Sequence, residues 1–333
     1  MARRKTLSDL TEAGFHRRLI DLLPSSNTDQ LPLGDDCAAL PWMGRRVLLL
    51  TTDAVAEGTH FPSDAPPRLV GRFAANVNLS DIAAKGGLPL GLLLDLLLPP
   101  KTEARWAEEV VIGLEEAARS ARVHLVGGDT KRAKVRAVVA MALGEGVAGH
   151  LMPRGGGHDG DLIATTGTVG RGGSAYLAWK HDLVGGERSL QRLLTVGPRL
   201  KEGTVLRDFA TAALDTSDGL ALSVRLLTEA SGLSAIVDEG KLPLDPEVPK
   251  VASKLGRSPT EVAFIGGDYE LLVAIPPRRA KAAKEAVGRV GGRLTFIGEL
   301  TERKGAHRSN ILMSGKKVLP LPDIGWDAFA PQL

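Results

Sequence analysis

Apolar and polar residues alternate along the chain in two rhythms, which together predict a protein of mixed helices and strands. Short, nearly continuous apolar runs are typical of buried strands. In the first half of the chain they occupy residues 46–50, 91–98, 123–126 and 135–143. Apolar residues repeated at three- and four-residue spacing are typical of helices that bury one face. These occupy residues 6–23, 70–85 and 102–122.

The second half repeats this mixture after a Gly-rich stretch at residues 152–161. Such stretches often connect domains, so we expect one domain at residues 1–150 and another at residues 151–333. Further strands are predicted at residues 162–168, 234–237, 269–275 and 294–297. Further helices are predicted at residues 174–180, 198–213, 220–231 and 277–290. A polar linker is expected at residues 24–32, and the fold class is expected to be α+β or α/β.

Aspartates beside Gly, Ser or Thr recur through this pattern, and several directly follow an apolar run. The series comprises Asp36, Asp53, Asp81, Asp129, Asp215 and Asp218. Any one of these clusters is compatible with ordinary turn or helix-cap chemistry. Their recurrence, mostly at the ends of predicted strands, favours a shared cation site. Mg²⁺ binds carboxylate oxygens together with the phosphates of a substrate.

Known nucleotide-binding motifs do not account for the series. The P-loop motif and the protein-kinase motifs are absent. Residues Gly170–Ala175 match the Gly-x-Gly-x-x-Ala pattern of dinucleotide-binding folds. Those folds place an acidic residue about 20 residues later, and only Glu187 is near, away from any predicted strand end. A dehydrogenase would also leave the aspartates unexplained.

Three other side chains have both a functional and a structural interpretation. His60, in the segment after Asp53, could contact a phosphate or orient a substrate, or it could be a structural histidine. Arg154 could clamp a phosphate with two hydrogen bonds, or it could be a solvated linker charge. Cys37 is interpreted as a small buried residue because no His is close in sequence to activate it. A zinc site is not expected, since no second His or Cys is suitably spaced.

Composition narrows the class of protein. Of the 333 residues, 43% are hydrophobic and 24% are charged, which is typical of a folded soluble protein. No run of 18 apolar residues predicts a membrane span, and no apolar signal core follows the basic segment Met1–Lys5. A net charge of +3 without a dense Lys/Arg tract gives no support for nucleic-acid binding. A single cysteine fits a reducing cytoplasm, where we expect the protein.

Taken in order, the motifs resemble those of one family. They are Gly34–Asp36, Thr51–Asp53 with Glu57–Phe61, Asn78–Asp81, Gly127–Thr130, Asp215–Gly219 and Asp268–Leu271. The set runs from about Leu10 to Phe329 and is similar to that of thiamine-monophosphate kinases. That family belongs to an ATP-binding superfamily with aminoimidazole ribonucleotide synthetase, selenophosphate synthetase and a hydrogenase-maturation factor.

The resemblance implies a homodimer of two-domain subunits, in which the sheet of the N-terminal mixed α/β domain forms the dimer and a C-terminal α/β domain follows. It implies ATP, several Mg²⁺ ions per site, and phosphorylation of thiamine monophosphate to thiamine diphosphate. The implied metal ligands are Asp36, Thr51, Thr52, Asp53, Asp81, Asp129, Asp215 and Asp218. The implied nucleotide contacts are Gly128, Asp129, Arg154 and Ser217. His60 and Trp326 are implied at the thiamine phosphate.

Two positions depart from the family pattern, and both lie on the substrate side. Gly267 stands where the family usually has Glu, and Ala328 stands where it usually has His. The alternatives are therefore an ATP-dependent enzyme with a different phosphorylated acceptor, or a nucleotide-binding homologue without catalysis. Selenophosphate synthetase is disfavoured because it typically carries Cys or selenocysteine and Lys in an N-terminal Gly loop. The hydrogenase factor needs a C-terminal Cys, whereas this sequence ends at Ala330–Leu333.

Overall fold

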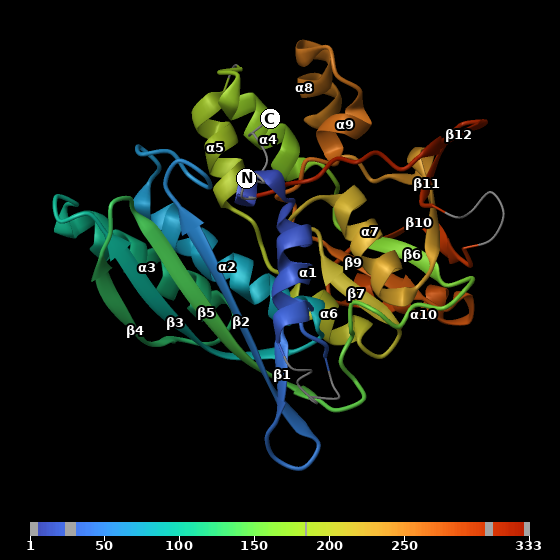
Figure 1. Ribbon diagram of the computed structural model, residues 1–333, viewed down its shortest axis with the longest axis horizontal. Helices are drawn as coiled ribbons and strands as arrows, with labels where there is room; N and C mark the ends of the chain where they lie inside the picture. The colour runs from blue at the N-terminus through green and yellow to red at the C-terminus, as the bar shows by residue number, and fades with distance from the viewer. Residues whose placement is uncertain (1–5, 24–30, 184, 304–308, 330–333) are drawn as a thin grey trace, which may run out of the picture.

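The computed structural model describes residues 6–23, 31–183, 185–303 and 309–329. Met1–Lys5, Ala330–Leu333 and all but the last two residues of the expected polar linker lie outside the described residues. Two β-sheets, one from each half of the chain, form the framework (Figure 1). No helix in the described ranges has the length and apolar character needed to cross a lipid bilayer.

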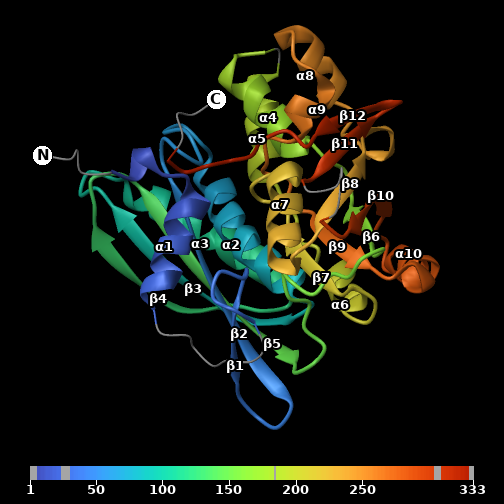
Figure 2. The same cartoon turned by 45° about the vertical axis from the view of Figure 1, so that its right-hand side comes forward.

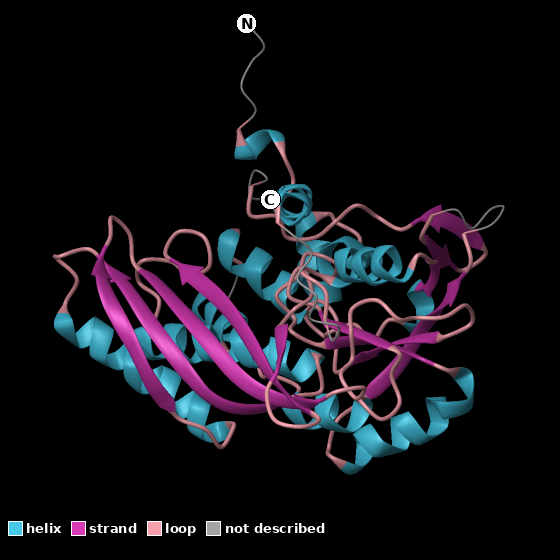
Figure 3. Ribbon diagram, turned by 60° about the horizontal axis from the view of Figure 1, so that its bottom comes forward, coloured by secondary structure: helices cyan, strands magenta, loops and turns pink. Residues whose placement is uncertain are grey.

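The first half of the chain forms a five-stranded sheet in the spatial order β1-β2-β5-β3-β4. Its strands are β1 (Ala38–Pro41), β2 (Arg46–Ala56), β3 (Leu88–Leu98), β4 (Leu125–Arg132) and β5 (Ala137–Val147). Neighbouring strands are antiparallel except β3 and β4, which are parallel. Helices α2 (Pro67–Ala84) and α3 (Ala104–Ser120) cover one face of this sheet. Figure 3 shows the other face without a covering helix from the described residues.

The two faces of this sheet differ because side chains alternate along each strand. On β5, Val138, Ala140 and Ala142 are buried on the face under the helices. Val139 and Met141, which point to the opposite face, remain partly exposed. The uncovered face therefore exposes apolar side chains beside charged ones such as Asp95, which pairs with Val139, and partly exposed apolar residues on a sheet that faces water are unusual.

The second half forms a seven-stranded sheet in the order β12-β11-β8-β10-β6-β9-β7. Its strands are β6 (Leu162–Thr166), β7 (Ala212–Asp215), β8 (Ser234–Asp238), β9 (Leu271–Ile275), β10 (Leu294–Thr301), β11 (Ile311–Ser314) and β12 (Lys317–Pro320). Only β8 and β11 pair in parallel among the described strands of this sheet.

Helices cover both faces of the second sheet. Along the fully buried strand β9, Leu272 and Ala274 pack with α4, α7, α8 and α9, whereas Leu271 and Val273 pack with α6 and α10. This explains why β9 is apolar at every position. The helices are α4 (Arg171–Lys180), α5 (Gly186–Leu194), α6 (Leu200–Leu206), α7 (Leu220–Ser231), α8 (Val248–Leu255), α9 (Pro259–Ala263) and α10 (Ala280–Arg289).

Two predicted helices are wrong in extent. The predicted helix at residues 6–23 is a 3-10 turn at Leu7–Asp9 followed by α1 (Glu12–Leu22), because Thr11 caps the helix by accepting a hydrogen bond from the Gly14 amide at 3.1 Å. The predicted helix at residues 198–213 ends at Leu206. Its last two residues instead begin β7, where small apolar side chains fit between the two helix layers.

Two aspartates predicted to follow strands lie inside them. Asp53 lies within β2, which continues to Ala56, and Asp129 lies within β4. The elements that the pattern did not predict are β1, α5, α8, α9, β11 and β12. None of these elements is longer than nine residues, and such short elements do not show a clear apolar repeat in the sequence. Two further 3-10 turns, Glu239–Lys241 and Pro277–Arg279, complete the structure.

Candidate active site

Helix α2 joins the two halves of the molecule. It packs on β2 and β5 of the first sheet, and its C-terminal end lies beside α6 and β7 of the second half (Figures 1 and 2). Ala83 and Ala84 belong to the apolar core beneath the second sheet. The polar side chains of Asn78 and Ser80 are fully buried on this helix. A helix that buries polar groups between two domains is a natural place for a site.

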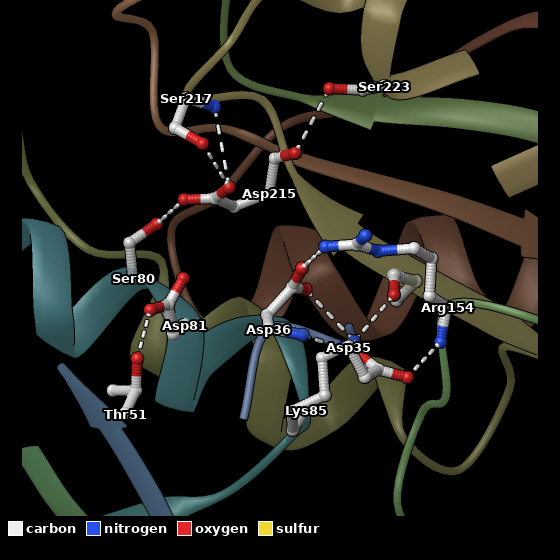
Figure 4. A network of polar contacts seen from close by, with 11 residues as sticks. Asp35, Asp36, Thr51, Ser80, Asp81, Lys85, Arg154, Asp215, Ser217 and Ser223 are labelled. Atoms are coloured by element: carbon white, nitrogen blue, oxygen red, sulfur yellow. Dashed lines mark hydrogen bonds and ion pairs between the residues drawn. The ribbon is translucent and has the colours of Figure 1, made fainter. Parts of the chain in front are cut away.

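Carboxylates from both halves meet at α2 (Figure 4). On the N-terminal side, Thr51 of β2 donates a hydrogen bond to Asp81 of α2 at 2.5 Å. On the C-terminal side, Asp215 at the end of β7 accepts hydrogen bonds from Ser80 at 2.7 Å and from Ser217 at 2.8 Å. The Ser80–Asp215 bond crosses between the two halves of the chain. Asp53 is held nearby, since its backbone amide donates to the Asn78 side chain at 3.0 Å.

The pKa values of these acids show how crowded the cluster is. Desolvation by the surrounding protein, followed by the negative charge of Asp215, raises the pKa of Asp53 to about 7, although part of this residue is open to solvent. Burial, followed by the charge of Glu12, raises the pKa of Asp218 to about 7. The pKa values of Asp81 and Asp215 are also raised, first by burial and then by neighbouring carboxylates. The cluster therefore favours the binding of positive charge, whether protons or metal ions.

The Asp35–Asp36 pair is different because it has basic partners. The Lys85 ammonium lies 2.6 Å from Asp35 Oδ1 and 2.9 Å from Asp36 Oδ2. Arg154 donates from its guanidinium to Asp36 Oδ1 and from its backbone amide to Asp35 Oδ2 at 2.8 Å. Burial alone would raise the pKa of Asp36, but the charges of Lys85 and Arg154 together lower it. Asp36 is therefore ionised in the folded protein.

The side chains fit a hard cation in their chemistry. Asp36 Oδ2 is buried and has the Lys85 ammonium, 2.9 Å away, as its charged partner. The carboxylate and hydroxyl oxygens that meet here are ligands of the kind that Mg²⁺ binds. Within the described residues, no group of three or more His, Cys, Asp or Glu side chains is placed so that it could hold a metal ion by itself. Mg²⁺ does not require one, since it usually keeps water and substrate phosphate oxygens among its ligands.

Three of the predicted site residues lie elsewhere. The Thr52 hydroxyl donates to the Ala140 carbonyl of β5 at 3.1 Å, so this side chain does not join Asp81. Asp129 pairs with Lys131 on the exposed strand β4, at the far edge of the first sheet from β1. With Gly128 it lines a shallow hollow of about 440 Å³ whose walls include Leu94. A side chain at Gly128 would collide with the Leu94 carbonyl, so the close approach of β3 and β4 requires glycine there.

The two predicted substrate residues lie together. The ring centroids of His60 and Trp326 are 6.3 Å apart, and Tyr176 also contacts Trp326, edge to face with the centroids 5.9 Å apart. The Trp326 backbone amide donates to the Asp218 carbonyl at 2.9 Å, which places this aromatic group beside the acidic cluster. His60 Nδ1 accepts from the Ala56 amide at 3.1 Å. Burial lowers the pKa of His60, so the neutral ring presents its proton on Nε2.

Helix α1 and the C-terminal segment bring another carboxylate to this group. The Glu12 amide donates to Asp327 at 3.1 Å, and Glu12 Oε2 accepts from the Ala328 amide at 3.0 Å. Phe15 packs edge to face on Phe329, with their ring centroids 5.8 Å apart. The charge of Glu12 contributes to the raised pKa values of Asp218 and Asp53. The N-terminal helix therefore holds the segment that carries Trp326.

The Gly170–Ala175 pattern is not a free anion site. It forms the start of α4, but Asp268 already accepts hydrogen bonds from the Gly170 and Gly172 amides at 2.7 and 2.8 Å. A protein carboxylate thus fills the place that a pyrophosphate takes in a dinucleotide fold. Because Asp268 is engaged there, it does not supply the carboxylate that is missing at Gly267.

Four residues of this region were not predicted as site residues: Asp35, Glu12, Lys85 and Tyr269. Asp35 was visible next to Asp36, but Lys85 and Glu12 resemble ordinary helix residues in the sequence. Tyr269 was part of a motif, and its backbone adopts a left-handed conformation with φ of 54°. Burial and the charge of Asp53 raise the pKa of its phenol well above the usual value. A non-glycine residue in this conformation is often found at functional sites.

Both halves of the chain match models of one class of protein. The N-terminal domain model of AIR synthase related proteins matches residues 34–148, and the corresponding C-terminal domain model matches residues 158–309. The two-domain fold is thus that of an AIR synthase related protein.

Individual relatives narrow the class to a family. A thiamine-monophosphate kinase of Aquifex aeolicus is 32% identical over 328 residues, 97% of this chain and 99% of the relative. The enzyme of that name from Escherichia coli K12 is 33% identical over 291 residues, 85% of this chain and 88% of the relative. The solved structure of AaThiL complexed with AMPPCP and TMP is 30% identical with a TM-score of 0.84, covering 98% of this chain and 100% of that chain. The chain belongs to the thiamine-monophosphate kinase family, as its motifs indicated.

Proposed function

We propose that this protein transfers the terminal phosphate of ATP to thiamine monophosphate and forms thiamine diphosphate. The observation that carries the proposal is the group of four carboxylates, Asp53, Asp81, Asp215 and Asp218, beside an aromatic pair. None of the four forms an ion pair with a Lys or Arg of the described residues. A site of this kind needs cations, and a nucleotide triphosphate brings them as its magnesium complex.

Phosphoryl transfer between two anions is limited by charge and position rather than by covalent chemistry. Bound Mg²⁺ would neutralise the phosphates and align the attacking and leaving oxygens. Asp53, Asp81, Asp215 and Asp218 would hold these ions, and Ser217 and Arg154 would contact the nucleotide. No side chain need act as a nucleophile, because a phosphate oxygen of the acceptor attacks directly.

The remaining assignments rest on the family. The proposed metal ligands also include Asp36, Thr51, Thr52 and Asp129. The proposed nucleotide contacts also include Gly128 and Asp129. Asp129 lies on β4, three strands away from Asp53 on β2. If it contributes, it does so through the nucleotide or through a second subunit. The apolar, uncovered face of the first sheet supports a homodimer formed by that face.

The aromatic pair supports a cationic aromatic acceptor. Thiamine monophosphate carries a positively charged thiazolium ring, and Trp is the best aromatic partner for a cation, at roughly 0.5–2 kcal/mol. Trp326 can stack on that ring, while the His60 Nε2 proton can be donated to the phosphate. Acidic charge from Asp218 and Glu12 around Trp326 favours the same cation.

The test is a direct product assay. Purified protein with Mg-ATP is offered thiamine monophosphate, thiamine, and a panel of other phosphorylated acceptors, and thiamine diphosphate and ADP are quantified by chromatography. We expect both products in equal amounts with thiamine monophosphate alone. ATP consumption with a different acceptor would support the assignment as a kinase but would show that its substrate is not thiamine monophosphate. Nucleotide binding without turnover of any acceptor would refute the enzymatic proposal.

A further inference from the structure

Lys85 is buried in an unusual way. It caps the C-terminal end of α2, its side chain has no exposed surface, and its ammonium donates to the Ala213 carbonyl of β7 at 2.8 Å. The same ammonium lies 2.6 Å from Asp35 and 2.9 Å from Asp36 (Figure 4). Lysine is rarely fully buried, and it occurs there when its charge is paired.

The acidic residues of the site fall into two groups by charge balance. Asp35 and Asp36 carry two negative charges, and Lys85 and Arg154 supply two positive charges in direct contact. Of the other four carboxylates, Asp81 and Asp215 accept hydrogen bonds from hydroxyl groups, and none of the four forms an ion pair with a basic residue of the described part of the chain. The charge of the Asp35–Asp36 pair is therefore balanced by the protein itself, whereas the other four carboxylates have no basic residue to balance them.

We propose that Lys85 is a built-in cation of this site and a positioning residue for Asp35 and Asp36. Its ammonium takes the place that a mobile cation would otherwise have to fill between the two carboxylates. It also fixes the Gly34–Asp36 segment against both α2 and β7 before any metal or nucleotide binds. A preformed ligand segment lowers the ordering cost of binding. The proposal deepens the function given above but concerns the unliganded protein as well.

The first experiment compares the wild type with Lys85→Met, which keeps an unbranched side chain one atom shorter and removes the charge. Lys201→Met, on the exposed surface of α6, is the matched control. Thermal unfolding is followed without nucleotide in a chelator. Mg²⁺, K⁺ or a bulky organic cation is then added at equal ionic strength. We expect Lys85→Met to melt on the order of 10 °C lower in the chelator, because the two buried carboxylates of Asp35 and Asp36 then have only Arg154 as a counter-charge.

The cation response distinguishes a charge role from simple packing. Mg²⁺ or K⁺ should restore most of the lost melting temperature in Lys85→Met, whereas the bulky organic cation should not. The wild type and Lys201→Met should gain clearly less from Mg²⁺ or K⁺ than Lys85→Met does. An equal loss under all conditions would show that Lys85 only fills space, and would overturn the proposal.

A double variant keeps the proposal testable if Lys85→Met does not fold. Asp35→Asn combined with Lys85→Met removes one charge of each sign and leaves the pair balanced. We expect it to recover at least half of the loss seen in Lys85→Met and to lose the excess cation response. If Lys85→Met cannot be purified, a stable double variant still supports the proposal. Failure of both variants contradicts it.

Turnover gives a second readout. Loss of a group that orients a metal ligand typically costs 10–100-fold in metal affinity or activity. The Mg²⁺ concentration for half-maximal rate should therefore rise about tenfold or more in Lys85→Met. The melting experiments contain neither ATP nor acceptor. If thiamine monophosphate proves not to be the substrate, the melting results on Lys85 still stand or fall separately.

Discussion

Two kinds of aspartate meet at the site, and their neighbours distinguish them. Asp36 is ionised because Lys85 and Arg154 are in contact with it. Asp218 has no such partner, and its pKa is raised to about 7 by burial and by neighbouring acids. Its carboxylate is therefore poorly stabilised in the free protein and available to a metal ion. Stability and function are expected to respond to mutation in opposite directions at Asp218.

Asp218→Asn should lower kcat by about 10–100-fold or more, because it removes a charged metal ligand. In a chelator it should not lower the melting temperature, since it also removes repulsion among buried carboxylates. Steady-state kinetics and thermal unfolding measure the two effects. Asp208→Asn, at an exposed position in the same half, is the control. An Asp218→Asn enzyme with wild-type kcat would contradict the metal assignment.

Gly267 shows how backbone conformation limits a substitution that the family pattern suggests. Its φ is +80°, and a Cβ atom there would meet only ordinary contacts, at 3.4 Å from Gly172 and 3.7 Å from Leu193. Space therefore exists for a side chain, but the left-handed backbone costs a non-glycine residue roughly 1–2 kcal/mol.

We expect Gly267→Glu to be less stable by about 1–2 kcal/mol but to have a lower KM for thiamine monophosphate. A regained charge-assisted hydrogen bond is worth about 1.5–3 kcal/mol, or roughly ten- to a hundredfold in affinity. Gly267→Gln has the same backbone strain and a side chain of the same shape but without the negative charge. The difference in KM between the two variants therefore measures the contribution of the carboxylate charge. Equal KM values for the two variants would show that the acceptor does not face this position.

At the scale of elements, the sequence predicted well where an apolar repeat was long. Helix α7 was predicted at its observed residues, and α2, α3, β3 and β5 within a few residues. Prediction failed at β7, where four residues are too few to distinguish a strand from the end of the helix predicted before it, and in other short elements. Most residues of the candidate site lie in motifs that contain aspartate, so they could be selected from the sequence alone. Glu12 and Lys85 could not, since only the packing of α1 and α2 gives them a role.

Helix α1 illustrates an element that depends on its contacts. It buries no residue fully, and it is attached through the Phe15–Phe329 pair, the Glu12 hydrogen bonds and an exposed ion pair of Arg17 with Glu229. Such a helix contributes little to global stability but can order the segment that carries Trp326.

Phe15→Ala should therefore raise the KM for thiamine monophosphate severalfold while changing the melting temperature by no more than a few degrees. The aromatic pair that it removes is worth about 0.5–1.5 kcal/mol. Leu22→Ala serves as a control on the same helix, because Leu22 is 78% exposed. An unchanged KM together with an unchanged melting temperature would mean that α1 does not organise the acceptor side.

At the scale of the whole molecule, the uncovered face of the first sheet is the feature that most needs explanation. Leu88 and Leu90 of β3 are 44% and 42% exposed, and Met141 of β5 lies on the same face. Monomeric proteins rarely leave such a surface to water. The motif resemblance and this surface both favour a dimer in which a second copy of the chain packs on the uncovered face of the first sheet.

Light scattering of the wild type at micromolar concentration should give about twice the subunit mass of 35.2 kDa. Met141→Lys should shift this toward a single subunit, because a buried charge at the centre of an interface is costly. Val318→Lys, at a site 61% exposed on the other sheet, should leave the mass unchanged. A wild type that scatters as one subunit would refute the dimer.

The hydrogen bond between Ser80 and Asp215, together with that from Lys85 to Ala213, joins the two halves at the place where ions are proposed to bind. Any cation bound there would stabilise the contact between the two domains in addition to taking part in catalysis. In a calorimeter, the protein should unfold in one endotherm when Mg²⁺ is present. In a chelator, the endotherm should broaden or split, because the repelling carboxylates then loosen the junction. The same side chains would then determine both catalytic activity and the stability of the interface between the two domains. A substitution that changes one of these properties is therefore expected to change the other.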